Sequence, residues 1–505
     1  MSENGTRRVV TSDSGEIVLN PGMGYMLIQR GHNKKRFDEL ARNEWFLAPQ
    51  LCDKIIFDVP WSVIEPEEGK YDWENPEWEG AMQSWINAGY KVGIQVRGMG
   101  CRGTLLNDGA PQWLFDRGAK YIDEPGAPGG VPMRYPVYWD RLYLEKSREL
   151  AFALGERYNG NPAVEMVFPG FLGHYGEMHI SEHTPIRPWV EAGFSLATYT
   201  AALHWQTESF KAAFPDKPLY QELGNLSYNT PDPDCETGPI SIVQARELVP
   251  YLVSQGINLK YNGLGANWDR WGEDPFMEGW YVDYCRAYHE WVKIIVENIS
   301  TFHAPCELET LRRCHASYTN RGGERQGVPE TAIDTIHDDC FRAMENYDPL
   351  SKQLYLDQTR NAPEIRRGTL REAAKIVGYR LLPAELHYPE RIVRKKAALL
   401  TSFWENRGAA RPREEFGILF ALLDGTGNCV WEQLTPPILP TTTALWECGC
   451  RVGERTELFV PETVQCGTYR LAIGLRRLSD HLPIRLPLPG GDAMGRYALG
   501  PVEIL

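Results

Sequence analysis

A glutamate, a histidine and a tyrosine lie in a glycine-rich segment that directly follows an apolar run. Residues 164–168 are nearly all apolar, which is typical of a strand buried on both faces. Residues 170–180 follow and contain His174, Tyr175 and Glu177 among three glycines, which let a backbone come close to a ligand. Because the carboxyl ends of parallel strands carry the chemistry of α/β folds, we predict that Glu177 is catalytic.

A second carboxylate is expected across the same site. Residues 304–310 contain Glu307 and Glu309, which would share one face of an extended segment. Glu307 is preferred because it is nearer to the strand predicted at residues 300–304. Two carboxylates on opposite sides of a pocket suit the cleavage of a glycosidic bond, in which one donates a proton and the other attacks or stabilises the sugar cation.

Such a pair works only if the two pKa values differ. An apolar wall with His174 and Tyr175 is predicted to keep Glu177 protonated. Arg97, together with hydroxyl or amide donors, is predicted to keep Glu307 charged. Arg97 also leaves an acidic sugar open as substrate, or has the simpler role of pairing with a catalytic carboxylate.

The elements that must position these groups alternate between strand-like and helix-like segments up to about residue 370. Eight strands are predicted at residues 24–28, 54–59, 91–96, 164–168, 218–222, 258–262, 300–304 and 331–337. Helices are predicted at residues 37–46, 77–88, 142–158, 196–214, 242–254 and 279–299. This order predicts an α/β fold, a (β/α)8 barrel of the TIM type over residues 1–374.

The predicted strand ends bring a set of side chains to one rim of the barrel. The set consists of Trp61, Arg97, Glu177, Glu222, Asn262, Glu307 and His337, and all of these apart from the catalytic candidates Glu177 and Glu307 are predicted to contact substrate. Aromatic faces pack against pyranose rings, so Trp268 and Trp271, in a loop rich in aromatic and charged residues, are predicted to contact substrate. His174 and Tyr175 are predicted to contact it from beside Glu177.

The pattern of apolar and polar residues changes after residue 374. Short alternating runs are separated by Gly, Pro and Asn, which is the pattern of an antiparallel β-sandwich. Residues 375–505 are therefore predicted to form a second domain of the all-β class.

Composition narrows the class of protein. The 505 residues are 43% hydrophobic and 24% charged, as in ordinary globular proteins, and the net charge of -14 argues against nucleic acid or an anionic membrane as partner. The first ten residues lack the apolar core of a signal peptide, and no stretch approaches about 18 apolar residues, so a cytoplasmic location is expected. A homo-oligomer is compatible with the sequence but is not indicated by it.

The cysteines do not form a spaced framework. Their number, 11, is odd, which favours reduced thiols over disulfides. Cys448 and Cys450, with Cys429 and Cys466, offer a zinc site as an alternative to buried free thiols, but two CxxC pairs are absent. No metal or organic cofactor is predicted.

Four stretches of the sequence resemble clan A glycoside hydrolases. The stretch 61–73, Trp-Ser-Val-Ile-Glu-Pro-Glu-Glu-Gly-Lys-Tyr-Asp-Trp, resembles the phrase after the second strand in the family 42 and family 35 β-galactosidases. Residues 173–177 are similar to the acid/base segment of related barrel proteins with a C-terminal sandwich, and residues 20–25 and 401–408 to their opening and sandwich phrases. The resemblance implies a retaining hydrolase of β-linked sugars, with Glu177 as acid/base and Glu307 as nucleophile, their carboxyls about 5 Å apart rather than about 6.5–9.5 Å as in inverting enzymes.

The sequence also departs from this group. The clan usually has Asn before the acid/base, where it binds the sugar 2-hydroxyl, and this chain has Gly176. Asn225 or Asn262 is predicted to supply the missing contact. The customary Trp after the eighth strand is replaced by His337 with two aspartates.

Two other functions remain open from the sequence. One is a carbohydrate-binding barrel that has lost catalysis, suggested by Gly176 and the absent Trp. The other is a metal-dependent hydrolase that would use His174, His179, Glu222 and His303. No HxH or HExxH spacing supports the second.

Overall fold

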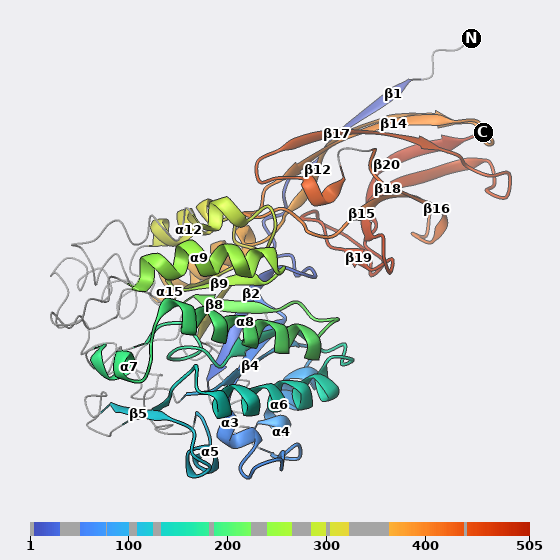
Figure 1. Cartoon of the computed structure of the whole chain (residues 1–505). Helices are drawn as coiled ribbons and strands as arrows, with labels where there is room; N and C mark the ends of the chain where they lie inside the picture. The colour runs from blue at the N-terminus through green and yellow to red at the C-terminus, as the bar shows by residue number, and fades with distance from the viewer. Residues whose placement is uncertain are drawn as a thin grey trace. The chain divides into compact units, whose positions relative to one another are not determined.

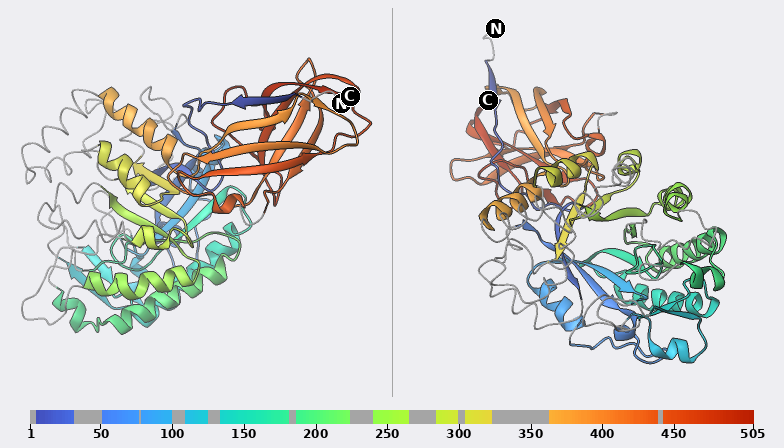
Figure 2. Two further views of the ribbon diagram at one scale, coloured as in Figure 1. Left: turned by 90° about the horizontal axis from the view of Figure 1, so that it is seen from above. Right: turned by 90° about the vertical axis from the view of Figure 1, so that its left-hand side faces the viewer.

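A computed structural model describes residues 5–30, 51–76, 78–99, 109–124, 133–180, 186–223, 240–264, 284–298, 304–322, 363–438 and 442–505. Two compact units emerge from the contacts within the chain. The barrel unit consists of Tyr25–Glu307 and Thr319–Leu370, and the sandwich unit of Met1–Gly24, Leu308–Tyr318 and Arg371–Leu505. Figures 1 and 2 show their elements.

Eight strands make the sheet of the barrel unit, in the order β7-β4-β3-β2-β11-β10-β9-β8. Their bounds are β2 Gly24–Arg30, β3 Lys54–Pro60, β4 Lys91–Arg97, β7 Val164–Gly170, β8 Tyr220–Leu223, β9 Asn258–Leu264, β10 Ile294–Asn298 and β11 Tyr318–Gly322. The recorded pairs of neighbours are parallel. A parallel bridge between Val167 and Leu219 joins the two ends of this order, so the sheet is a nearly closed barrel of the TIM type, as predicted.

Helices follow the strands along the chain and cover the outside of the sheet (Figure 1). Their bounds are α3 Trp61–Ile64, α4 Glu79–Asn87, α5 Gln112–Asp116, α6 Arg141–Tyr158, α7 Arg187–Glu191, α8 Leu196–Ala213, α9 Ile240–Ser254, α12 Ala304–Arg313 and α15 Pro363–Ile376. A short hairpin of β5 Tyr121–Glu124 and β6 Met133–Pro136 precedes α6. None of the helices described is long and apolar enough to cross a membrane.

Local sequence explains the helix that leads into the candidate site. Asp140 caps α6 by accepting a hydrogen bond from the Tyr143 backbone N–H, at 3.2 Å. The buried residues of α6 recur every three or four positions, which gives the helix one apolar face. Gly155 lets α6 approach α8 closely, because a Cβ there would lie 2.2 Å from the Ala213 carbonyl oxygen. This packing fixes α6 and α8, the helices that precede and follow β7 in the chain, relative to each other.

The seventh and eighth strands of the sheet lie earlier in the chain than predicted. The seventh strand is Ile294–Asn298, which lies inside the helix predicted at residues 279–299. The seventh strand had been predicted at residues 300–304, of which 300–303 lie outside the described residues, and Ala304 begins α12. The eighth strand is Tyr318–Gly322, and the segment predicted for it, residues 331–337, also lies outside the described residues.

The sandwich unit contains two sheets. One has the order β1-β12-β14-β17, and the other has the order β13-β20-β18-β15-β16 with β19 beside β18. The bounds are β1 Thr6–Val10, β12 Leu381–Pro389, β13 Arg391–Ile392, β14 Ala398–Asn406, β15 Phe416–Leu423, β16 Cys429–Thr435, β17 Arg451–Leu458, β18 Gly467–Arg477, β19 Pro483–Ile484 and β20 Tyr497–Ile504, with a 3₁₀ turn at Thr443–Leu445. Thr6–Val10 pairs with β12, although it falls in the range 1–374 predicted for the barrel.

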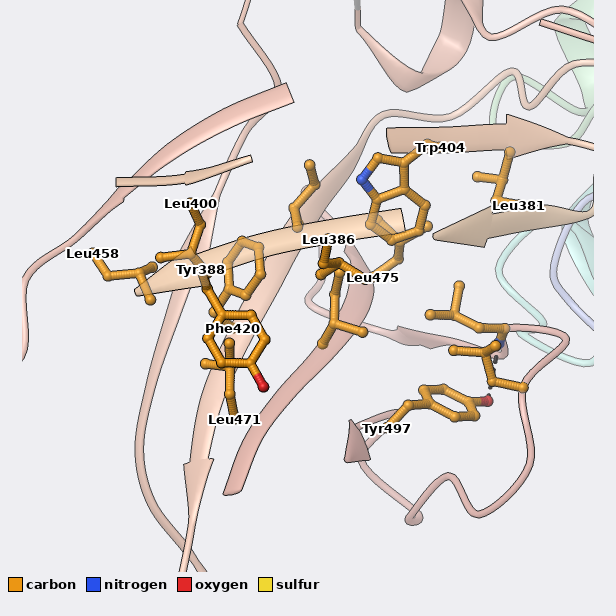
Figure 3. Packing of buried hydrophobic residues seen from close by; sticks show 14 of the residues in the cluster. Leu381, Leu386, Tyr388, Leu400, Trp404, Phe420, Leu458, Leu471, Leu475 and Tyr497 are labelled. Carbon is orange, nitrogen blue, oxygen red and sulfur yellow. Dashed lines mark hydrogen bonds between the residues drawn. The ribbon is translucent and has the colours of Figure 1, made fainter. Parts of the chain in front are cut away.

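One apolar core lies between these two sheets. Leu386, Leu400 and Trp404 face it from the first sheet, and Phe420 and Leu471 from the second (Figure 3). All five side chains are buried. Alternate residues of β14 and β17 point into this core, as expected for antiparallel strands with one buried face.

Candidate active site

The segment after β7 folds into a tight loop that presents Glu177. The His174 backbone N–H donates to the His179 carbonyl oxygen at 2.7 Å and closes the loop. Four residues inside it have positive φ: Gly173 (80°), Tyr175 (60°), Gly176 (77°) and Met178 (66°). A positive φ is costly for residues other than glycine. The glycine spacing that marked this segment in the sequence therefore serves a strained turn at the carboxyl end of β7.

Gly176 has a second reason to be glycine. A Cβ on Gly176 would lie 2.8 Å from the Cα of Gly170, the last residue of β7. Real Cβ atoms do not approach backbone this closely. The Asn that precedes the acid/base in clan A enzymes therefore does not fit at position 176 of this backbone.

Two buried glutamines hold the loop from α8 and β8. Gln206 accepts from the Phe171 backbone N–H at 3.1 Å and donates to Gln221 Oε1 at 3.0 Å. Gln221 in turn donates to the carbonyl oxygen of Gly176 at 3.2 Å. Buried amides that satisfy one another specify a single arrangement. The residue before Glu177 is thus tied to two neighbouring elements.

Glu177 lies in a largely buried position. Its side chain is 15% exposed, and its Oε2 lies 3.8 Å from His179 Nδ1. Burial raises the pKa of this carboxyl to about 7, and the charges of Glu222 and Glu297 add to the rise, whereas His179 and Arg97 act against it. At neutral pH a substantial part of Glu177 is therefore protonated and able to donate.

A lysine and two carboxylates lie close together at the ends of three adjacent strands. Lys260 of β9 donates from its Nζ to Glu297 Oε2 of β10 at 3.1 Å and to Glu222 Oε1 of β8. All three side chains are at most 5% exposed. The charges of Glu222 and Glu297 raise the pKa of Lys260, although burial opposes this, so the ammonium group stays charged.

Two further pairs complete the polar interior. Gln95 of β4 donates to Glu222 Oε2 at 2.5 Å, and Arg97 of β4 pairs with Asp58 of β3 at 2.5 Å. The sheet register explains the Arg97–Asp58 pair, because Asp58 stands beside Gln95, two positions before Arg97 on β4, whereas Gln95 and Glu222 come from strands that are not neighbours. Buried charges persist only when they are paired and hydrogen-bonded. Arg97 therefore has a carboxylate partner, but this partner is Asp58 and not one of the predicted catalytic carboxylates, so neither role predicted for Arg97 is confirmed.

The structure changes the second catalytic candidate. Glu307 lies in α12, not in an extended segment after a strand, and Glu309 on the same helix is exposed. Glu297 instead occupies the carboxyl end of the seventh strand and is 4% exposed. Its charge acts on Glu177 and raises the pKa of that carboxyl. A carboxylate does lie at the end of the seventh strand, but it is Glu297, because this strand lies earlier in the chain than predicted.

The rings of Trp61 and His174 are enclosed by other side chains of the protein. The Trp61 indole is fully buried, donates to Glu65 Oε2 at 2.7 Å and packs edge-on against Phe171. His174 is also fully buried, and its ring stacks on Tyr135 with centroids 4.1 Å apart. Packing on all sides leaves neither ring a face for a sugar, which corrects the substrate contacts predicted for both.

Tyr175, close to Glu177 in the loop, is only partly buried, and its predicted contact with substrate stays a prediction. The Arg97 guanidinium carbon lies 5.7 Å from the centre of its ring. Glu222 also lies in the site, but both of its oxygens accept hydrogen bonds from Lys260 and Gln95. Both oxygens of Glu222 therefore have partners within the protein, and its predicted contact with substrate stays a prediction.

The remaining predicted contacts cannot be placed. Asn225, Trp268, Trp271 and His337 lie outside the described residues, as does His303 of the metal-dependent alternative. Asn262 belongs to β9 by its backbone. In the sandwich unit, Cys448 and Cys466 are exposed free thiols, contrary to the expected burial.

Sequence reasoning missed Glu297 and Lys260, although a signal for Glu297 was present. Residues 293–297 read Lys-Ile-Ile-Val-Glu, and residues 54–58, which begin the second strand, read Lys-Ile-Ile-Phe-Asp. Both are β-branched runs that end in an acid. The pairing of Lys260 with two carboxylates depends on sheet register, which the sequence does not display.

A sequence model of a known family matches the part of the barrel that contains its second to fourth strands. Residues 55–168, from β3 into β7, match the sequence model of glycoside hydrolase family 42, described as β-galactosidase. This match confirms the resemblance to clan A glycoside hydrolases that the motifs indicated. A comparison with curated proteins found no match.

Several solved structures are similar at low identity. An exo-β-1,4-mannosidase from Opitutaceae bacterium strain TAV5 is 12% identical with a TM-score of 0.38, over 72% of this chain and 64% of that one. A β-galactosidase from the psychrophilic Marinomonas ef1 is 14% identical with a TM-score of 0.40, over 68% and 60%. A psychrophilic family 10 endo-β-1,4-xylanase is 11% identical with a TM-score of 0.36, over 65% and 97%. This chain thus spans less than two thirds of the mannosidase and β-galactosidase chains.

Proposed function

We propose that this protein cleaves a β-linked glycoside or oligosaccharide with retention of configuration, a proposal supported by the match of residues 55–168 to the β-galactosidase family model. Glu177 is the acid/base and Glu297, in place of Glu307, is the nucleophile. The observation that carries this proposal is the pair itself. Two buried carboxylates stand at the carboxyl ends of the fourth and seventh strands, in unlike electrostatic surroundings.

Glu177 supplies the proton in the first step. Its pKa of about 7 lets it remain protonated in neutral solution and donate to the glycosidic oxygen as the bond breaks. The burial that raises this pKa also strengthens the hydrogen bond to the leaving group. After the aglycone leaves, the Glu177 carboxylate takes a proton from the incoming water.

Glu297 supplies the attacking oxygen. The Lys260 ammonium 3.1 Å from its Oε2 favours the charged carboxylate over the acid. Attack on the anomeric carbon forms a covalent glycosyl ester, which water then hydrolyses. Two inversions at one carbon give retention.

The substrate class follows from the matched family. The family description names β-galactosidase, so β-galactosides are the first substrates to test. Arg97 is paired with Asp58, which reduces the case for an acidic sugar. The product anomer, followed by NMR during hydrolysis, distinguishes retention from inversion.

Substitution tests the two carboxylates. Glu177→Gln and Glu297→Gln are each expected to lower turnover of a β-linked nitrophenyl galactoside by more than about 10⁴-fold. Glu307→Gln is the matched control and is expected to leave turnover within about twofold of the wild type. Azide should restore activity to Glu297→Ala by attacking in place of the carboxylate. Near wild-type turnover of Glu297→Gln, or loss in Glu307→Gln alone, would contradict the assignment.

A further inference from the structure

Lys260 occupies an unusual place for a lysine. Its side chain is 1% exposed, and its Nζ donates to one oxygen of Glu222 and, at 3.1 Å, to one oxygen of Glu297. An ammonium group has three donors and is costly to remove from water. Two carboxylates around one ammonium offset that cost and hold the group between them.

The pairing of neighbouring strands brings Lys260 together with Glu222 and Glu297, and these three residues are called the bridge below. Lys260 stands beside Glu222 in the β8–β9 pair and beside Ile295 in the β9–β10 pair. Glu297 lies two positions beyond Ile295, where the register of the β9–β10 pair shifts, and its Oε2 accepts from Lys260 Nζ at 3.1 Å. The bridge therefore comes from three neighbouring strands of a rigid sheet.

Glu222 is held on its other side as well. Gln95 donates to its Oε2 at 2.5 Å, and Gln95 belongs to β4, which is not a neighbour of β8 in the sheet. Each oxygen of Glu222 thus has a donor. A carboxylate bound in this way is held in one orientation and is not free to attack the sugar.

We propose that Lys260 is a positioning residue that orients the Glu297 carboxylate for attack. Glu222 is then the counter-charge that holds Lys260 in place. This inference rests on the proposed function. Glu222 is then no third catalytic carboxylate. The same anion also acts on Glu177, where Glu222 and Glu297 oppose the effects of His179 and Arg97. The bridge therefore couples the nucleophile to the acid.

The first test replaces Glu222 by Gln and measures kcat/KM against pH. Glu222 is one of the charges that raise the pKa of Glu177. Its removal should shift the basic limb of the profile to lower pH, by on the order of one unit. Gln95 can rotate its amide to accept from the new side chain, because its Oε1 has no partner among the described residues. An unshifted profile would overturn the proposal, as would a loss of turnover as deep as that of Glu297→Gln.

The second test replaces Lys260 by Met and by Arg. Lys260→Met should lower kcat by about 10²–10³-fold with little change in KM, because the first bond to the sugar forms more slowly. Lys260→Arg keeps the cation and should recover part of the loss. Wild-type kcat in Lys260→Met would overturn the proposal. If the single variant does not fold, the pair Lys260→Met with Glu222→Gln removes both buried charges and should show the same loss of kcat.

A buried lysine elsewhere in the barrel serves as the control. Lys54, at the amino end of β3, is 3% exposed and pairs with Asp53 at 2.6 Å. Lys54→Met should lower stability but leave the pH profile of kcat/KM in place; a shifted profile would overturn the assignment to Lys260. Glu297→Gln separates the two proposals: if it keeps turnover, the proposed function fails. If it is inactive while the Lys260 and Glu222 variants match the wild type, only the positioning role fails.

Discussion

Gly176 packs directly on Gly170, so that a Cβ on Gly176 would lie 2.8 Å from the Gly170 Cα. The last residue of β7 thus lies in direct contact with the residue that precedes Glu177. This contact explains a departure from related enzymes, because no side chain fits at position 176. The loop reaches its conformation by giving up the Asn found there in clan A enzymes.

Gly176→Ala is expected to damage the site more than the fold. The substitution adds a Cβ at φ 77° and against backbone, a strain of about 1–3 kcal/mol that displacement of Glu177 can relieve. A fall in kcat of more than about 10²-fold is predicted, measured on an aryl β-galactoside together with thermal unfolding. Gly160→Ala, where a Cβ meets nothing within 4 Å, is the control and should change neither quantity.

The activity profile should have a basic limb near pH 7. Glu177 has to be protonated for the first step, and its pKa is raised to about 7 by burial and by the charges of Glu222 and Glu297. Above that pH the carboxyl loses its proton, so kcat/KM should fall about tenfold per unit. Substrates whose leaving group needs no proton should show a weaker fall. A profile flat from pH 6 to 9 on a poor leaving group would contradict the role of Glu177.

Glu177→Gln should raise stability at alkaline pH. The pKa of Glu177 rises from 4.5 to about 7 on folding, so the folded protein loses stability progressively as the pH increases between these values. Above pH 7 the folded state therefore carries a penalty of about 3 kcal/mol, which Gln removes. Thermal unfolding at pH 8 should show the gain, and at pH 4 the two proteins should match. Glu156→Gln, on the exposed side of α6, should change stability at neither pH.

Gln221→Leu should impair catalysis without preventing binding. Gln221 links Gln206 to the carbonyl oxygen of Gly176, and its loss leaves buried groups unpaired at a cost of about 1–3 kcal/mol. We expect kcat to fall by about tenfold and KM to change little, because Glu177 moves relative to the bond. Gln83→Leu, an exposed glutamine on α4, is the control. Equal kinetics in the two variants would show that the link does not hold the loop.

Much of the barrel was predictable because its first four strands are largely apolar runs, and because its fifth and sixth strands follow helix-like segments in the expected alternation. The strands found at Lys54–Pro60 and Lys91–Arg97 extend the predicted ones by a single residue. The seventh strand failed because Ile294–Asn298 is a short apolar run next to an amphipathic stretch, where strand and helix periods cannot be told apart. The eighth, Tyr-Thr-Asn-Arg-Gly, is polar and gives little strand signal.

The candidate site was predictable only where local sequence sets its geometry. Glu177 stands out because its loop needs glycine at two positions of positive φ. Glu297 was missed with its strand. Lys260 and Gln95 act on residues 37 and 127 positions away along the chain, through pairings that only a folded sheet creates. Trp61 was correctly placed at a strand end, but whether an indole faces solvent or core depends on packing.

The most direct test of the account is to trap the glycosyl ester. A 2-deoxy-2-fluoro-β-galactoside with an activated leaving group should inactivate the wild-type protein, and mass spectrometry of its peptides should find one sugar on Glu297. Attachment of the sugar to Glu222 or Glu307, or inverted product from a protein that is never labelled, would contradict the account.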